Sequence, residues 1–176
     1  MEKPFVLFDE IEGVDGSPEA RRRLMVNFNR RFWPTYRRLG EMARGGRVGQ
    51  IESADLVMRV NLRPWCEVTT HRLSPGEGGV LYDLGSQTLD LVRFLFERDP
   101  VAVTTECSSR RWEGDRVQLR LALESGIIVR CDLAYDERTQ ERVTIHGSEG
   151  ALTLDDPNTT IRLERGNSTS MTAPII

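Results

Sequence analysis

Three polar residues are spaced so that one helix face could carry them. In the stretch GGVLYDLGSQTLDLVRFL, which starts at Gly78, the polar side chains are those of Asp83, Gln87 and Asp90. At about 100° per residue, positions i, i+4 and i+7 fall within a narrow arc of an α-helix. Apolar residues occupy most of the remaining surface, so the helix is expected to be largely buried. Its polar stripe must then face water, a partner or a pocket, and only in a pocket would these residues have a chemical role.

Lys3 is a second candidate because it is the only lysine in the chain. Arginine does not release its proton in a protein, whereas the pKa of a lysine ammonium responds to its surroundings. A position that needs proton transfer therefore cannot become arginine. An arginine-biased composition with one leftover lysine near a terminus explains the same count, and Glu2-Lys3-Pro4 leaves both interpretations open.

The composition favours one globular domain and disfavours two classes of partner. The 176 residues are 39% hydrophobic and 29% charged, with a net charge of −3 and both signs interspersed. No basic block suggests nucleic acid or a membrane surface as a partner. The N-terminus lacks the pattern of a secretory signal and no segment reaches a membrane-spanning length, so we expect a cytoplasmic protein.

Cysteine, histidine and glycine spacing argue against several kinds of site. Cys66, Cys107 and Cys131 are odd in number and far apart, which favours reduced thiols over a disulfide framework or a zinc site. His71 and His146 are too distant in sequence to suggest a metal site. The glycines of GGRVG, residues 45–49, do not form the G-x-G-x-x-G fingerprint of dinucleotide binding.

The elements that must position these residues follow from periodicity and turn signals. We expect helices over 34–43 and 78–98, strands over 24–28, 48–60, 101–106, 117–123 and 127–135, a hairpin over 141–156, and one short strand after residue 158. This order predicts an α+β domain: a mostly antiparallel open β-sheet with helices packed on one face. The other face would meet water or form a dimer surface.

Four motifs resemble the Gfo/Idh/MocA oxidoreductases in the same order. They are EKP at the start, VNFNRRFWPTY from Val26, GGVLYDLGSQTLDL from Gly78 and ERVTIHGSEGALTLDD from Glu141. The resemblance covers the C-terminal domain of that family, which is similar to the C-terminal domain of glyceraldehyde-3-phosphate dehydrogenase. It implies an oxidoreductase that uses NAD or NADP on a sugar, a polyol or a related carbonyl compound.

The resemblance also implies a Rossmann domain ahead of the Glu-Lys-Pro motif. A βαβ unit needs about 30 residues, and nothing of that kind precedes Lys3. We therefore expect no cofactor bound by this chain alone. A truncated gene, a fragment and one half of a split enzyme remain open as explanations.

Carried over residue by residue, the resemblance assigns catalytic roles to Lys3, Asp83 and Gln87, and cofactor contacts to Lys3 and Pro4. The family usually has histidine at the position of Gln87, and an amide cannot transfer a proton as histidine does. The proton would instead move through Lys3, Asp83 or water.

Four further residues are implied as substrate contacts: Asn29, Arg30, Asn61 and Asp90. Two of them have a plainer explanation. Arg30 and Arg31 could form a solvated pair, and Asp90 could form a salt bridge with Arg93 or a neighbour.

The resemblance divides the chain into three parts. Residues 1–23 are a remnant of the interdomain segment, 24–165 form the substrate and oligomerisation domain, and 166–176 form a loose tail. We expect a sugar-like substrate and a homo-oligomer joined through the open sheet face. The alternative is a non-catalytic binding or oligomerisation domain that has lost its cofactor site and catalytic base.

Overall fold

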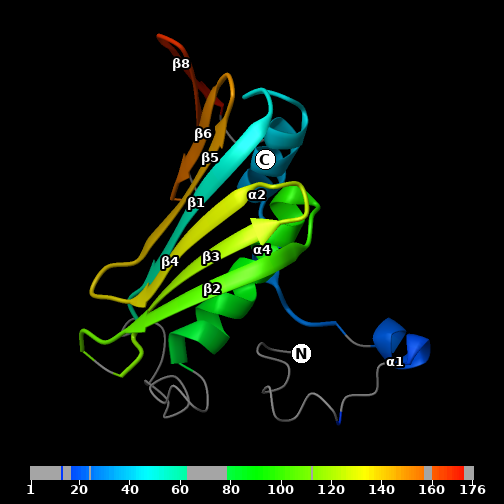
Figure 1. Ribbon diagram of the computed structural model, residues 1–176, viewed down its shortest axis with the longest axis vertical. Coiled ribbons are helices and arrows are strands. Elements are labelled where there is room, and N and C mark those ends of the chain that lie inside the picture. Colours follow the sequence, from blue (N-terminus) through cyan, green and yellow to red (C-terminus); the bar gives the residue numbers. More distant parts are fainter. Residues whose placement is uncertain are drawn as a thin grey trace.

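A single open sheet forms the body of the protein (Figure 1). The computed structural model describes residues 13, 17–23, 25–62, 79–111, 113–156 and 160–172. Within these residues eight strands have the spatial order β2-β3-β4-β1-β5-β6-β7-β8. Their bounds are β1 Ile51–Val60, β2 Pro100–Ser108, β3 Arg116–Leu123, β4 Ile128–Tyr135, β5 Gln140–Gly147, β6 Gly150–Asp155, β7 Ile161–Arg165 and β8 Ser168–Thr172.

The strand β1 joins two antiparallel meanders. One meander is β2-β3-β4 and the other is β5-β6-β7-β8, and β1 lies between them. It pairs parallel with β4, where Leu56 faces Cys131, and antiparallel with β5, where Leu56 faces Val143. The other neighbouring strands of the described sheet are antiparallel. The predicted α+β class and mostly antiparallel open sheet are confirmed.

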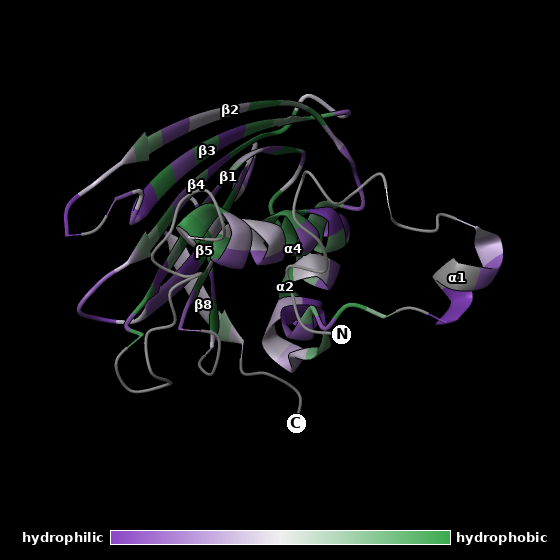
Figure 2. Ribbon diagram, turned by 90° about the horizontal axis from the view of Figure 1, so that it is seen from below, coloured by the Kyte–Doolittle hydropathy of each residue, from purple (hydrophilic) through white to green (hydrophobic). Residues whose placement is uncertain are grey.

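Helices cover one face of this sheet (Figure 2). The two that pack on it are α2, Pro34–Arg44, and α4, Ser86–Phe96, whereas α1, Pro18–Arg23, lies well to one side in both views. Alternate residues of the inner strands point to the helices, as the period of two requires, and are buried with Leu91 and Leu95 of α4, whereas the edge strands β2 and β8 are mostly exposed. Strand residues of the opposite parity are mostly polar and form the helix-free face.

The helix that carries the polar stripe is not uniform. Leu81–Gly85 form a π-helical turn that leads directly into α4. Such turns are rare and occur often at functional sites, because the wider turn displaces side chains from their α-helical directions. The helix ends at Phe96, where Glu97 takes a left-handed conformation with φ 52°. Gln87 and Asp90 lie in the α-helix α4, whereas Asp83 lies in the π turn. The expected spacing of 100° per residue therefore applies from Gln87 to Asp90 but not from Asp83 to Gln87.

Three local expectations were wrong. Residues 25–28 form no strand and lead into a 3-10 turn, η2, Asn29–Phe32, whose two arginines pair with distant acids. The first long strand begins at Ile51 rather than at 48, because residues 45–50 form turns in which Gly49 has φ 75°. Two strands rather than one follow residue 158, since a turn at Gly166 folds β8 back onto β7.

Candidate functional site

Asp83 lies in the π turn and is held by a buried phenol. Tyr135 is the last residue of β4 and is 3% exposed. Its hydroxyl donates to Asp83 Oδ2 at 3.0 Å, and it also lies 3.4 Å from the carbonyl oxygen of Gly79. The phenol thus connects the start of the helix to the end of a central strand. Sequence reasoning missed Tyr135, whose only signal was its place at the end of an alternating apolar run.

Asn61 reaches the same end of the sheet because β1 and β4 are parallel. Val60 is paired with Tyr135, so the residues that follow the two strands lie together. The side-chain amide of Asn61 donates to the carbonyl oxygen of Glu137 at 2.7 Å, and its backbone N–H donates to Thr139 Oγ1 at 3.2 Å. Asn61 therefore directly follows β1, whereas Asp83 reaches the end of the neighbouring strand β4 through its hydrogen bond with Tyr135.

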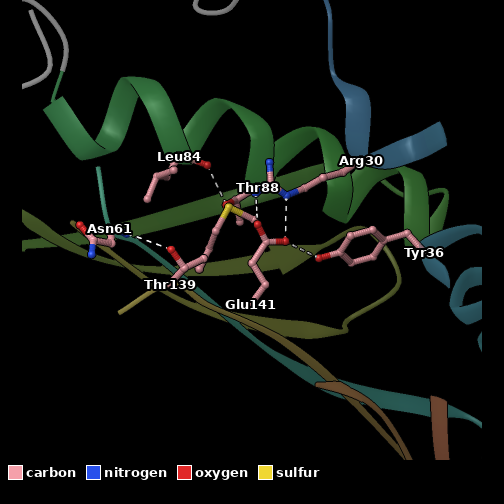
Figure 3. Close-up of polar contacts among 8 residues, drawn as sticks. Arg30, Tyr36, Asn61, Leu84, Thr88, Thr139 and Glu141 are labelled. Carbon is pink, nitrogen blue, oxygen red and sulfur yellow. Dashed lines mark hydrogen bonds and ion pairs between the residues drawn. The ribbon is translucent and has the colours of Figure 1, made fainter. Parts of the chain in front are cut away.

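Gln87 and Thr88 follow Asp83 by about one turn and have different environments. Gln87 is half-buried, and within the described part of the chain its side chain makes no hydrogen bond. Thr88 is fully buried, and its hydroxyl donates to the carbonyl oxygen of Leu84 at 2.8 Å and lies 3.6 Å from the sulfur of Met58 (Figure 3). Thr88 therefore anchors the π turn, and Gln87 keeps its amide for another contact.

Asp90 is engaged in an ion pair with Arg31. The Arg31 Nε donates to Asp90 Oδ2 at 3.0 Å, and Arg31 Nη2 also donates to Asp90 Oδ1. The Asp90 side chain is only 12% exposed, and the Arg31 guanidinium lies 5.9 Å from the ring centre of Phe94. This pair holds η2 against α4. The neighbour that salt-bridges Asp90 is thus Arg31, whereas Arg93 pairs with Asp99.

Arg30 points into the protein rather than into solvent (Figure 3). Its guanidinium donates twice to the Glu141 carboxylate, through Nε to Oε2 at 3.2 Å and through Nη2 to Oε1. Tyr36 of α2 donates its phenol proton to the same Oε2 at 2.9 Å. Burial, with the Glu141 charge as the next cause, raises the pKa of Tyr36 above its usual range. Arg30, Tyr36 and Glu141 together connect η2, α2 and β5.

The remaining candidates are scattered or lie outside the described residues. Asn29 is exposed at the start of η2. Lys3 and Pro4 lie outside the described residues, so their predicted roles stay predictions. The structure thus relates Asp83 to Asn61 only through the paired strand ends at Tyr135 and Val60. Gln87 lies about one turn after Asp83, and Arg30 and Asp90 are in separate ion pairs. Glu141, the partner of Arg30, is the first residue of the ERVTIHGSEGALTLDD motif, but no spacing rule relates two residues so far apart in sequence.

The described residues contain no metal-binding cluster, no membrane-spanning helix and no dinucleotide-binding turn. No group of three or more metal-binding side chains is present there. None of the helices in the described ranges is both long and apolar enough to cross a membrane. The sheet and helices described here also contain no glycine-rich turn between a parallel strand and a helix of the kind that cradles a dinucleotide, so these residues do not fit an NAD(P) site.

Comparison with known proteins matches this architecture to a family. The model of the GFO/IDH/MocA C-terminal domain matches residues 36–153, which include most of α2, the π turn, α4 and β1 to β5. The chain belongs to the GFO/IDH/MocA family. The family expected from the four motifs is confirmed.

Two curated relatives show how much of a longer protein this chain matches. Inositol 2-dehydrogenase of Rhizobium meliloti is 28% identical over 78% of this chain and 43% of its own length. D-apiose dehydrogenase of Paraburkholderia graminis is 30% identical over 98% of this chain and 48% of its own length. This GFO/IDH/MocA chain therefore spans about half the length of the curated relatives it matches.

The solved structures support the fold. A putative oxidoreductase from Thermotoga maritima superposes with a TM-score of 0.81 at 14% identity, over 99% of this chain and 57% of that one. An oxidoreductase from Agrobacterium radiobacter, solved with NAD+, L-tartaric acid and magnesium, gives a TM-score of 0.76 at 18% identity, over 99% and 53% of the two chains.

Proposed function

We propose that this chain is the substrate-binding and oligomerisation half of an NAD(P)-dependent oxidoreductase that acts on a sugar, a polyol or a related carbonyl compound. The observation that carries the proposal is the position of Asp83, a carboxylate of the π turn that is held by the buried Tyr135 at the end of β4. π-Helical turns occur frequently at functional sites. The names of the inositol and D-apiose dehydrogenases supply the substrate class.

The chemistry assigned to this chain is the binding and orientation of a hydroxyl group. A carboxylate accepts hydrogen bonds from hydroxyl groups, and an amide both donates and accepts, so Asp83 and Gln87 suit the vicinal hydroxyls of a polyol. Lys3 is the proposed proton-transfer group, because its ammonium can release a proton whereas the amide of Gln87 cannot, with Asp83 and water as the other proposed routes. Pro4 and Lys3 are the proposed contacts to a nicotinamide whose binding domain is not among the described residues.

The proposed pocket contains fewer residues than the resemblance implies. Asn29 and Asn61 remain proposed substrate contacts with Asp83 and Gln87. Arg30 and Asp90 already have their charges compensated by Glu141 and Arg31. We assign these two residues to holding η2 in place beside the pocket.

Ligand titration of the purified chain tests the proposal. Inositol and D-apiose are added to 15N-labelled protein, and amide chemical shifts are followed by NMR. We expect saturable shifts around α4 that need about tenfold more ligand in Asp83→Asn and are unchanged in Arg142→Met, which removes only an exposed ion pair with Asp155. A wild-type chain that binds neither compound, with or without NADH, would contradict the proposal.

The oligomerisation part rests on the helix-free face. Strands β1 to β4 line a depression of about 580 Å³ on this face. Arg120 and Arg130 lie directly opposite each other there, an arrangement of like charges that destabilises a sheet. Asp55 lies 3.6 Å from Arg130 and 2.9 Å from His146, but Arg120 has no ion pair within the described part of the chain.

A second copy of the chain would supply the missing acid. In a twofold interface the same surface meets itself, so each Arg120 can approach an acidic residue of the other copy. Glu106 lines the same depression and also has no ion pair among the described residues. A non-catalytic binding or oligomerisation domain would share this face, and it is favoured only if polyol binding fails while the oligomer forms.

A further inference from the structure

Tyr135 occupies a position that none of the motifs assigned. It is the last residue of β4, it is almost completely buried, and the residue beside it in the parallel register is Val60 of β1. Its hydroxyl is the only polar atom of the side chain, and it is directed at the Asp83 carboxylate, 3.0 Å from Oδ2. A hydrogen bond to an ionised oxygen is stronger and more directional than one between neutral groups.

We propose that Tyr135 is a positioning residue of the polyol pocket: its phenol fixes the orientation of the Asp83 carboxylate that receives the substrate hydroxyl. This inference rests on the function proposed above. Asp83 lies in a π turn, where the backbone does not follow the regular α-helical course, so backbone geometry alone leaves its side chain less constrained. A rigid phenol from the neighbouring strand supplies that constraint.

The arrangement matches what an oriented binding site requires. A carboxylate whose rotamer is fixed before binding loses less conformational entropy when it meets a hydroxyl. The two groups come from different elements, β4 and the π turn, which Thr88 further secures by its bond to Leu84. The Tyr135 phenol is therefore built into the sheet, whereas the group that it orients lies at the start of the helix.

A matched control exists in the same protein. Tyr36 is a second buried tyrosine whose hydroxyl donates to a carboxylate, Glu141 Oε2 at 2.9 Å. Removing either hydroxyl deletes a hydrogen bond to a carboxylate, so both changes should lower the urea midpoint. Only Tyr135 touches the acid of the proposed pocket. The pair Tyr135→Phe and Tyr36→Phe thus separates a positioning role from a structural one.

The experiment measures the dissociation constant for inositol by NMR titration of the full chain. We expect Tyr135→Phe to weaken binding by about five- to tenfold, the equivalent of one hydrogen bond, and Tyr36→Phe to leave it unchanged. In an Asp83→Asn background, Tyr135→Phe should cause no further loss, because the two residues act as one unit.

A second readout does not depend on ligand. A buried, hydrogen-bonded phenol proton should give a slowly exchanging downfield 1H resonance that is lost in Tyr135→Phe and displaced in Asp83→Asn. Equal inositol affinity in wild type and Tyr135→Phe would overturn the positioning role and leave the proposed function intact. A wild-type chain that binds no polyol would instead overturn the proposed function, and this inference with it.

Discussion

The buried ion pair between Arg30 and Glu141 makes a quantitative prediction about stability. The two side chains are 11% and 10% exposed, so Arg30→Met leaves a carboxylate in a nearly dry site with the Tyr36 hydroxyl as its remaining partner among the contacts described. Removing one member of a buried pair costs about 3–5 kcal/mol, because the other charge stays uncompensated. For a chain of this size that corresponds to a fall in Tm of roughly 6–20 °C.

The adjacent residue in β5 provides the control. Arg142 pairs with Asp155, but these side chains are 45% and 55% exposed, so Arg142→Met should cost about 0–1 kcal/mol. Both variants are measured by urea denaturation followed by circular dichroism. The double variant Arg30→Met/Glu141→Leu should recover most of the loss, since an apolar pair removes the buried charge altogether. The reasoning is refuted if Arg30→Met costs no more than Arg142→Met.

Three further predictions concern pH, packing and assembly. Burial raises the pKa of Cys131 from 9.0 to about 12, so above pH 9 the folded chain keeps a proton that the unfolded chain releases. The free energy of unfolding should therefore fall as pH rises above about 9, by at most ~1.4 kcal/mol per pH unit. Cys131→Ala should flatten this slope in urea melts recorded from about pH 9 to 10; an unchanged slope would mean that the thiol is not responsible. Gly147→Ala would place Cβ 2.3 Å from the carbonyl oxygen of Val48 and should lower stability by about 1–3 kcal/mol, whereas a change below ~0.5 kcal/mol would show that β5 moves away freely. Arg120→Glu should convert an oligomer to monomer in light scattering, and an unaltered mass would argue against the helix-free face as the interface.

Periodicity predicted the elements whose identity depends on local pattern. The helix after Pro34 and the alternating strands β3 and β4 were found close to their expected bounds, because one side of each faces a common core. The π turn was not predicted, since the analysis of spacing assumed a uniform 3.6-residue period. A strand was expected over 24–28 and the turn η2 was not predicted, because its conformation depends on Arg30 and Arg31 reaching partners remote in sequence.

The site was predicted only in part, for the same reason. The parallel register of β1 and β4 places Tyr135, the partner of Asp83, beside Val60, the residue before Asn61, and no local pattern specifies this register. Tyr135 was predicted only as the last residue of a strand, because the role of its hydroxyl depends on Asp83, which is remote in sequence. The partners of Arg30 and Asp90 likewise became visible only in three dimensions.

The central place of β1 has a consequence for synthesis on the ribosome. β1 ends at Val60, but its two neighbours begin at Ile128 and Gln140. At about 5–20 residues per second, on the order of ten seconds pass between the emergence of β1 and that of its first partner. During that interval the apolar side of the strand, including Leu56 and Met58, has no sheet to enter. The nascent chain therefore exposes an unpaired, chaperone-accessible strand until the second half of the domain is made.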